Sequence, residues 1–223
     1  MTEKKEFSGA ASCSLTDEIA DLVRDRILKG EYEIGEKIKE NQIATELKVS
    51  RTPIREAFKL LENEGLIDYI PNRGCFAKGF TKQDVNDIYA VREALERLAV
   101  ERAVERISPE EIRELEEQCD LMEFYAKKKD AKKVLELNSV FHDGIYSSTR
   151  SRFMAQVLRS YKSYIDKTRK SAFYDESYLL AILREHREIL DAIRSGDKEK
   201  AVEAVSRHLE SSQDRAETMW NLK

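Results

Sequence analysis

The sequence predicts a mostly α-helical protein with an N-terminal winged helix-turn-helix, which includes a small β-hairpin wing, and a C-terminal all-α helical bundle. The 223 residues include only 8 Gly and 3 Pro, which favours long helices over a turn-rich β fold. Apolar residues recur at helical spacing along most of the chain, and two short β-type runs occur only between residues 66 and 78. We therefore expect a polar tail over 1–14, a winged helix-turn-helix domain over 15–79 and an all-helical domain over 80–223.

Composition limits the class of protein and its compartment. Charged residues make up 37% of the chain and the net charge is −4, which argues against a non-specific nucleic-acid coat but allows a specific DNA-binding protein with locally concentrated cations. The longest apolar run, 178–183, is too short to span a bilayer, and the first ten residues lack the apolar core of a signal peptide. Three cysteines without a CxxC pair favour a reducing compartment. We expect a cytoplasmic protein with no membrane partner.

The first part should fold in the order helix, helix, turn, helix, hairpin, which is the order of a winged helix-turn-helix. Ser50 or Thr52 can cap the third helix, and Pro53 is tolerated in its first turn because amides there have no helical partner. The expected elements are a helix from Ser14 or Thr16 to Gly30, helices over 40–47 and 51–64, and strands over 66–70 and 75–78 joined by the turn 71–74.

From Thr81 onward the sequence keeps helical spacing and shows no strand pattern. Short polar or glycine-containing breaks divide this region, among them Ser108-Pro109 and 195–197. These breaks predict six helices of one bundle, with boundaries near 82–106, 109–128, 130–148, 151–173, 175–194 and 197–220.

The third helix carries cationic and hydroxyl side chains opposite its apolar stripe. Arg51, Thr52, Arg55 and Lys59 fall on one helical face, and Ser50 directly precedes it. Arginine can bind O6 and N7 of guanine in the major groove, while hydroxyl and ammonium groups suit phosphates. We predict that this face binds double-stranded DNA, with base contacts from Arg51 and Arg55. The alternative is the solvated charged face of an ordinary amphipathic helix.

The tip of the expected wing holds Asn72, Arg73 and Gly74. These residues would meet the neighbouring minor groove or the phosphate backbone, and Gly74 permits a positive φ and a close approach. A simple hairpin turn is the alternative. One winged helix contacts too few base pairs for genomic specificity, so we expect a homodimer on a palindromic operator.

The N-terminal region resembles the DNA-binding domain of GntR-family transcription regulators. The resemblance covers roughly 15–80 and rests on the runs IATELKVSRTPIREAF (43–58), LENEGLI (61–67) and PNRG (71–74). It implies DNA contacts by Arg51, Thr52, Arg55 and the wing residue Gly74, and dimer contacts through the helical domain.

All three histidines of the chain, His142, His186 and His208, fall on apolar faces of different expected helices. A single histidine on such a face is usually a hydrogen-bonded core residue, and this remains the alternative for each. Three imidazoles that converge inside a bundle suit a divalent metal, Zn²⁺ or Ni²⁺. Asn138 lies one turn before His142, so its side-chain oxygen could be a fourth ligand.

The second half resembles the FCD ligand-binding domain of FadR-like GntR regulators, in the six-helix VanR-type arrangement. The resemblance covers about 81–215 and rests on VREALE (91–96), NSVFH (138–142), HREILDAIRSGD (186–197) and His208-Leu209. It implies a sensor of small organic or sugar acids whose carboxylate touches the bound metal. Many metal-binding members have Asp where this chain has Asn138, so the metal is held more weakly here or by the three histidines alone.

Arg92 and Tyr89 are the candidate effector-binding residues. A guanidinium can pair with a carboxylate through two hydrogen bonds, while an exposed ion pair with Glu96 is the alternative for Arg92. The favoured function is a transcription regulator with a metal-dependent acid sensor and no catalytic residues. A helical-bundle metalloenzyme and a metal-free helical interaction module are the alternatives; an enzyme is disfavoured because no HExxH-type glutamate accompanies the histidines.

Overall fold

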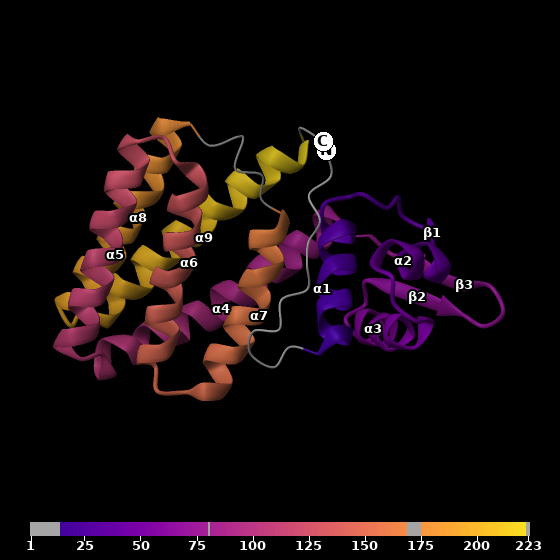
Figure 1. Ribbon diagram of the computed structural model, residues 1–223. Helices are drawn as coiled ribbons and strands as arrows, with labels where there is room; N and C mark the ends of the chain where they lie inside the picture. The colour runs from indigo at the N-terminus through magenta and orange to yellow at the C-terminus, as the bar shows by residue number, and fades with distance from the viewer. Residues whose placement is uncertain (1–13, 80, 169–174, 222–223) are drawn as a thin grey trace. The chain divides into compact units, whose positions relative to one another are not determined.

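The computed structural model describes residues 14–79, 81–168 and 175–221. The described residues form two compact units, which divide between Thr81 and Lys82 (Figure 1). The first unit is a winged helix-turn-helix and the second is entirely helical, so the predicted fold class is confirmed. The expected tail over 1–14 lies outside the described residues except for Ser14.

The first unit is built on two helices that pack against each other, α1 and α3. Ser14 caps α1 in a reciprocal hydrogen-bonded box with Asp17, which satisfies amides that have no helical partner. The stripe predicted for α3 is buried, with Ile54 and Leu61 fully inaccessible. The elements of this unit are α1 (Leu15–Leu28), β1 (Lys37–Ile38), α2 (Glu40–Leu47), α3 (Arg51–Asn63), β2 (Ile67–Ile70) and β3 (Gly74–Ala77).

The wing is a three-stranded antiparallel sheet in the order β1-β3-β2, so the prediction of a two-stranded hairpin was incomplete. The missed strand is β1, in which Ile38 pairs with Cys75. Two residues between charged neighbours are too short to show the alternation by which strands are recognised in a sequence. In the hairpin itself, Ile67 pairs with Ala77 and Ile70 with Gly74.

Two tight turns orient the predicted DNA-binding residues. Between α2 and α3, Lys48 takes the left-handed conformation with φ 56°. Ser50 occupies the N-cap position of α3, but its side chain makes no capping hydrogen bond. At the wing tip, the Arg73 amide donates to the Ile70 carbonyl at 3.0 Å while Asn72 has φ 61°, which leaves the turn residues projecting from the sheet.

The second unit contains the six expected helices, and each break lies within a few residues of its predicted place. Ser108 caps α5 in a box with Glu111, and Pro109 follows in the first turn. Residues 169–173, predicted to end the fourth bundle helix, lie outside the described residues. The helices are α4 (Lys82–Arg106), α5 (Pro109–Lys127), α6 (Ala131–Ser148), α7 (Arg152–Thr168), α8 (Glu176–Arg194) and α9 (Lys198–Asn221).

Helix α4 contacts α6, α7, α8 and α9, while α5, α6 and α8 run side by side (Figure 1). Apolar side chains from every one of these helices form a single core. The same interior also buries several polar side chains, namely Arg92, Glu96, Asn138, His142, Lys162, His186, His208 and Ser212. No helix in the described part of the chain is long and apolar enough to cross a membrane.

Candidate DNA-binding surface and metal centre

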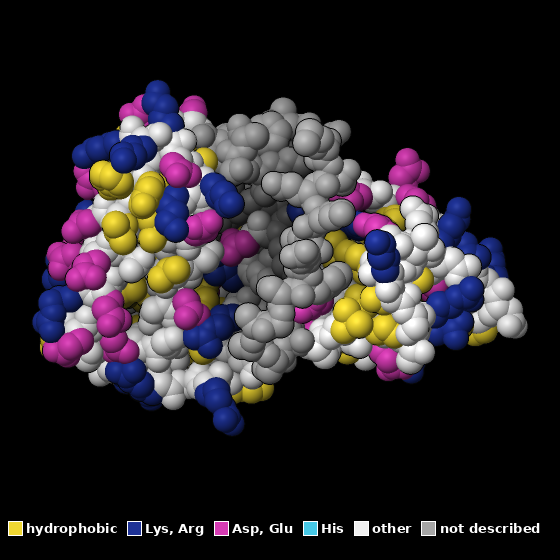
Figure 2. Space-filling view, viewed as in Figure 1, with side chains coloured by type: hydrophobic (Ala, Val, Ile, Leu, Met, Phe, Trp, Pro, Cys, Tyr) yellow, Lys and Arg dark blue, Asp and Glu magenta, His cyan; other side chains and the backbone are white. Residues whose placement is uncertain are grey.

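The predicted DNA-binding face of α3 is open to solvent. Ser50, Arg51, Thr52, Arg55 and Lys59 are all exposed, while the opposite side of the helix is packed against the unit. On the face shown in Figure 2, Lys and Arg side chains gather at the end of the unit that carries the wing. A convex helix with cations on its outer side has the shape and charge that fit the major groove of DNA.

Arg55 is held in place by an acidic residue from the neighbouring helix. Its Nε lies 2.9 Å from Oε2 of Glu40 in α2. This contact engages one edge of the guanidinium, and the Arg55 side chain remains 60% exposed. The terminal nitrogens can therefore still present the parallel pair of donors that recognises guanine. Lys59 bonds to Glu56 one turn before it, as is common on exposed helices.

The wing adds a second cationic surface. Asn72 and Arg73 are exposed, and Gly74 has φ 103°, a conformation that a side chain would strain. The Arg73 guanidinium lies 5.8 Å from the centre of the Phe76 ring, and the Lys37 ammonium lies 5.9 Å from it. These contacts hold both cations against the sheet, where they can meet phosphate groups.

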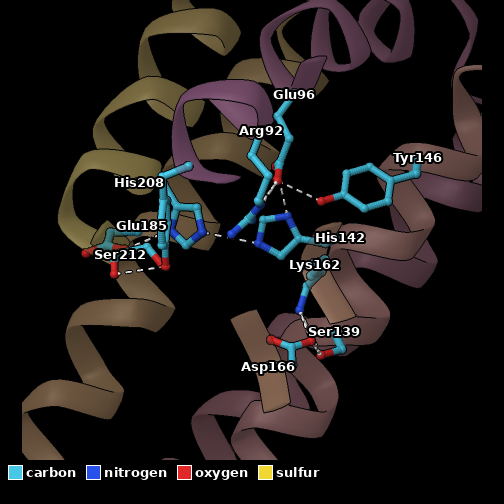
Figure 3. A network of polar contacts seen from close by, with 11 residues as sticks. Arg92, Glu96, Ser139, His142, Tyr146, Lys162, Asp166, Glu185, His208 and Ser212 are labelled. Atoms are coloured by element: carbon cyan, nitrogen blue, oxygen red, sulfur yellow. Dashed lines mark hydrogen bonds and ion pairs between the residues drawn. The ribbon is translucent and has the colours of Figure 1, made fainter. Parts of the chain in front are cut away.

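The three histidines converge in the interior of the bundle. His142 comes from α6, His186 from α8 and His208 from α9, and all three are buried. One nitrogen from each ring lies within 4.8 Å of the others. The Nε2 atoms of His142 and His208 are 3.2 Å apart (Figure 3). The predicted convergence of the imidazoles is therefore present in the structure.

The Nδ1 atom of each imidazole is directed at an oxygen, which turns Nε2 toward the other rings. The partners are Ile182 O for His186 at 2.6 Å, Glu185 Oε2 for His208 at 2.8 Å, and Glu96 Oε2 for His142 at 3.3 Å, the last being an ion-pair distance without hydrogen-bond geometry. Within the described residues, Nε2 of His186 is buried and has no hydrogen-bond partner. Metal-binding histidines are typically oriented in this way by an acceptor at the second nitrogen.

The residues fit a divalent metal. Ligands about 2.0–2.1 Å from a tetrahedral Zn²⁺ lie roughly 3.3 Å apart, close to the observed separation of His142 and His208. Burial lowers the pKa of His142 to about 4, of His186 to about 3 and of His208 to about 4, despite opposing contributions from Glu96 and Glu185. All three imidazoles are therefore neutral at pH 7, which is the form that binds metal.

Two carboxylates support the histidines. Burial would raise the pKa of Glu96, but Arg92, His142 and Tyr146 hold it well below its usual range. Burial would also raise the pKa of Glu185, yet hydrogen bonds from Arg215 and His208 lower this pKa to about 2. Both carboxylates therefore stay ionised.

The structure gives Arg92 and Tyr89 clear partners. Arg92 donates to Glu96 Oε1 from Nε at 3.0 Å and from Nη2 at 2.6 Å, and both side chains are only 2% exposed. The ion pair of the sequence prediction therefore exists, but its expected exposure was wrong because α4 is covered by other helices of the bundle. Tyr89 is buried, and its hydroxyl lies 2.9 Å from Ser212 Oγ in α9. Asn138 is buried one turn before His142.

A cleft of about 580 Å³ opens between α6 and α7. Most of its exposed lining surface is apolar, although the lining residues include Ser139, Asp143, Tyr146, Arg159, Lys162 and Asp166. Tyr146 links this cleft to the histidines, because its hydroxyl donates to Glu96 Oε1 at 2.8 Å. Lys162 also lies near the histidines, since its charge contributes to the lowered pKa of His142 after the larger effects of burial and Glu96.

Three supporting residues were not predicted from the sequence: Glu185, Lys162 and Arg215. Lys162 carries a recognisable signal, because it falls on the buried stripe of α7 between Leu158 and Ile165. Glu185 directly precedes His186 in the sequence, yet its carboxylate contacts Nδ1 of His208 in another helix. That pairing depends on the register between α8 and α9, which sequence spacing does not reveal.

Family models match both units of the chain. Residues 15–77 match the bacterial regulatory proteins of the gntR family, and residues 87–211 match the FCD domain. The HTH-type transcriptional regulator YdhC of Bacillus subtilis is 32% identical over 188 residues, which cover 83% of this chain and 84% of that protein. The gluconate operon transcriptional repressor of Bacillus licheniformis is 27% identical and is matched over 91% of this chain and 85% of its own length.

Solved structures share the fold. McbR/YncC of Escherichia coli superposes with a TM-score of 0.74 at 19% identity, covering 94% of this chain and all of that one. A GntR-type regulator from Rhodococcus sp. RHA1 superposes with a TM-score of 0.63 at 26% identity, covering 92% of this chain and 98% of that one.

The buried histidines make the metal-free protein sensitive to acid. Their pKa values of about 3–4 lie below the value of about 6.5 in an unfolded chain, so the unfolded state alone binds protons as the pH falls from 6.5 toward 4. We expect the free energy of unfolding of chelator-treated protein, measured by urea denaturation, to fall over this range. The carboxylates Glu96 and Glu185 add their own loss only below about pH 4.5.

A His186→Gln variant is the matched comparison for this prediction. It should lose stability more gradually, by up to roughly 1.4 kcal/mol less per pH unit, since one titrating group is gone. Equal slopes for the two proteins between pH 6.5 and 4.5 would show that His186 titrates normally in the folded state.

Proposed function

Because the chain belongs to the GntR family of bacterial transcription regulators and carries an FCD domain, we propose that it is an operator-binding switch whose bundle senses a small acid through a bound divalent metal. It is a DNA-binding transcription regulator, and its relatives are regulators rather than enzymes. The observation that carries the sensing function is the buried group of His142, His186 and His208 with their Nδ1 atoms already engaged.

The proposed DNA-binding domain spans 15–79. Arg51 and Arg55 contact bases in the major groove, and the remaining residues contact phosphates or the minor groove. The exposure of the α3 face and the cations held against Phe76 support this assignment. The phosphate and minor-groove contacts are Ser50, Thr52, Lys59, Asn72, Arg73 and Gly74. A homodimer, joined through the domain 80–223, would bind a palindromic operator with one winged helix on each half-site.

The proposed metal site holds Zn²⁺ or Ni²⁺ through His142, His186 and His208, with Asn138 as an oxygen ligand. A bound divalent ion supplies a Lewis-acidic position for a carboxylate. Glu96 and Glu185 orient two of the imidazoles, and Arg92 acts on the site by holding Glu96. Tyr89, which is hydrogen-bonded to Ser212, is one of the buried residues that surround the proposed metal site.

The proposed effector is a small organic acid. One relative is named for control of a gluconate operon, which makes gluconate a reasonable first acid to test. A metal-free helical interaction module is the remaining alternative, and measurement of the metal content separates it from the proposed sensor.

Arg55→Ala should weaken operator binding by about 1–3 kcal/mol and relax sequence preference at one base pair of each half-site. The measurement is a competition gel shift with the DNA upstream of the protein's own gene, in parallel with Lys59→Ala. Loss of the phosphate contact from Lys59 should weaken binding to all sequences alike and reduce its salt dependence. Unchanged specificity of the Arg55 variant would remove Arg55 from base recognition.

His186→Ala should lose most of the bound metal, and Glu185→Gln should weaken metal binding by roughly 10–100-fold because His208 loses its orienting carboxylate. Asn138→Asp should tighten binding by adding a negative charge. Metal content and competition with a chromophoric chelator measure these changes. Glu188→Gln is the control, since Glu188 is an exposed carboxylate of the same helix. Equal metal content in the His186 variant and wild type would identify the histidines as core residues.

The acid should bind the metal-loaded protein far more tightly than the stripped protein. Calorimetry of gluconate against chelator-treated protein, and against protein reloaded with Zn²⁺ or Ni²⁺, measures the difference. Equal heats and affinities for both forms would mean that acid recognition needs no metal.

A further inference from the structure

Three ion pairs surround the histidines, and they differ in how easily the pair can separate. The side chains of Arg92 and Glu96 are each 2% exposed, so neither charge could be solvated by water if the pair separated. Arg215 binds Glu185 through two hydrogen bonds of 2.6 and 2.7 Å, and Glu185 also holds His208. Separation of the first pair would leave an unpaired buried charge, which is strongly unfavourable. Separation of the second pair would leave charges that are only 17% and 19% exposed and would also disturb the acceptor of His208.

The third pair, Lys162 with Asp166, is built differently. The Lys162 side chain is 7% exposed, whereas that of Asp166 is 32% exposed. Lys162 Nζ donates to Asp166 Oδ2 at 2.6 Å and to Ser139 Oγ at 2.9 Å. Asp166 can therefore turn toward solvent and be rehydrated when it gives up the ammonium, provided that another anion takes its place.

Lys162 also stands where the interior and the cleft meet. It lines the cleft between α6 and α7, and Figure 3 shows its ammonium between His142 and the Ser139–Asp166 pair. Its positive charge lowers the pKa of His186 as well as that of His142, although burial and other groups have larger effects on both pKa values. A molecule in the cleft can thus reach this cation without crossing the apolar core.

The cleft lining indicates the chemistry of the molecule. The lining includes Ser139, Ser163 and several charged side chains, yet most of the surface that they present to the cleft is apolar. A few polar groups on a mostly apolar surface are typical of a small-molecule site, in which the polar groups fix the orientation of the ligand. Such a lining suits a small organic acid whose carboxylate meets the Lys162 ammonium.

We propose that Lys162 is the specificity-determining anchor of the sensor: the carboxylate of a small organic acid enters the cleft between α6 and α7 and replaces Asp166 as the partner of the Lys162 ammonium. This inference rests on the proposed acid-sensing function. The exchange keeps the buried cation paired at every stage, because one carboxylate leaves as another arrives. Arg92, the cation expected from the sequence to bind the carboxylate, is paired with Glu96, and Lys162 takes that role in its place.

The test uses two variants that break the same ion pair from opposite sides. Lys162→Met removes the anchor and should weaken gluconate binding to the metal-reloaded full chain by roughly tenfold or more, as expected for the loss of a charged hydrogen bond. Asp166→Asn removes the competing carboxylate and should tighten gluconate binding. A purely structural role of the pair would weaken binding in both variants, so the opposite signs are specific to the proposal.

The readouts are the dissociation constant by calorimetry and the metal content of each protein, which should equal that of wild type. Arg159→Gln is the control, because Arg159 lines the same cleft one turn away but pairs with Asp143 at its exposed edge. Hexanoate, which has the same carbon chain without hydroxyl groups, is titrated in parallel as a second acid.

Each contrary result has a distinct meaning. If the reloaded wild-type protein binds neither acid, the acid-sensing function fails and this inference fails with it. If wild type binds gluconate and Lys162→Met binds it equally well, only the assignment of Lys162 is overturned. Equal weakening by Arg159→Gln would likewise overturn it in favour of a general charge effect of the cleft.

Discussion

The bundle depends on the satisfaction of polar groups that it buries at its centre. Three neutral imidazoles and the Arg92–Glu96 pair lie buried among apolar side chains, where an unpaired charge would be strongly unfavourable. Two partly exposed pairs, Lys162–Asp166 and Arg215–Glu185, lie beside them. The required partners come from different helices: Glu96 of α4 meets Tyr146 of α6, and Glu185 of α8 meets His208 of α9. The polar network therefore constrains how these helices pack, and the convergence of the Nε2 atoms follows from the way their Nδ1 atoms are bound.

Much of the fold could be predicted because its signals are local. The capping box of Ser108 and Glu111, with Pro109 between them, marks the start of α5 in the sequence alone. The strand β1 could not be predicted, since its two residues gain strand geometry only by pairing with β3. Elements defined by their own caps and periodicity were found, and the element defined by a distant partner was not.

The same distinction applies to the candidate site. The histidines could be recognised because each lies on an apolar face of its own helix. The hydrogen bond between Glu185 and His208 could not, because it depends on the register between two helices. Arg92 illustrates the intermediate case. Its spacing to Glu96 indicated the ion pair, but burial of that pair follows from the packing of α4 against four other helices. Intrahelical geometry was predictable, while exposure was decided by tertiary packing.

Charge balance connects the proposed metal to the proposed acid. Around the histidines, the cations Arg92, Lys162 and Arg215 are matched by the carboxylates Glu96, Asp166 and Glu185, and Asn138 is neutral. A divalent ion would add two positive charges to this balanced interior, and an arriving carboxylate would offset part of them. Each ligand then favours the other, and thermodynamic linkage requires the coupling to be reciprocal: the factor by which metal tightens acid binding is the factor by which the acid tightens metal binding. An aspartate at position 138 would supply part of the offset permanently, so the neutral side chain leaves more of the coupling to the effector.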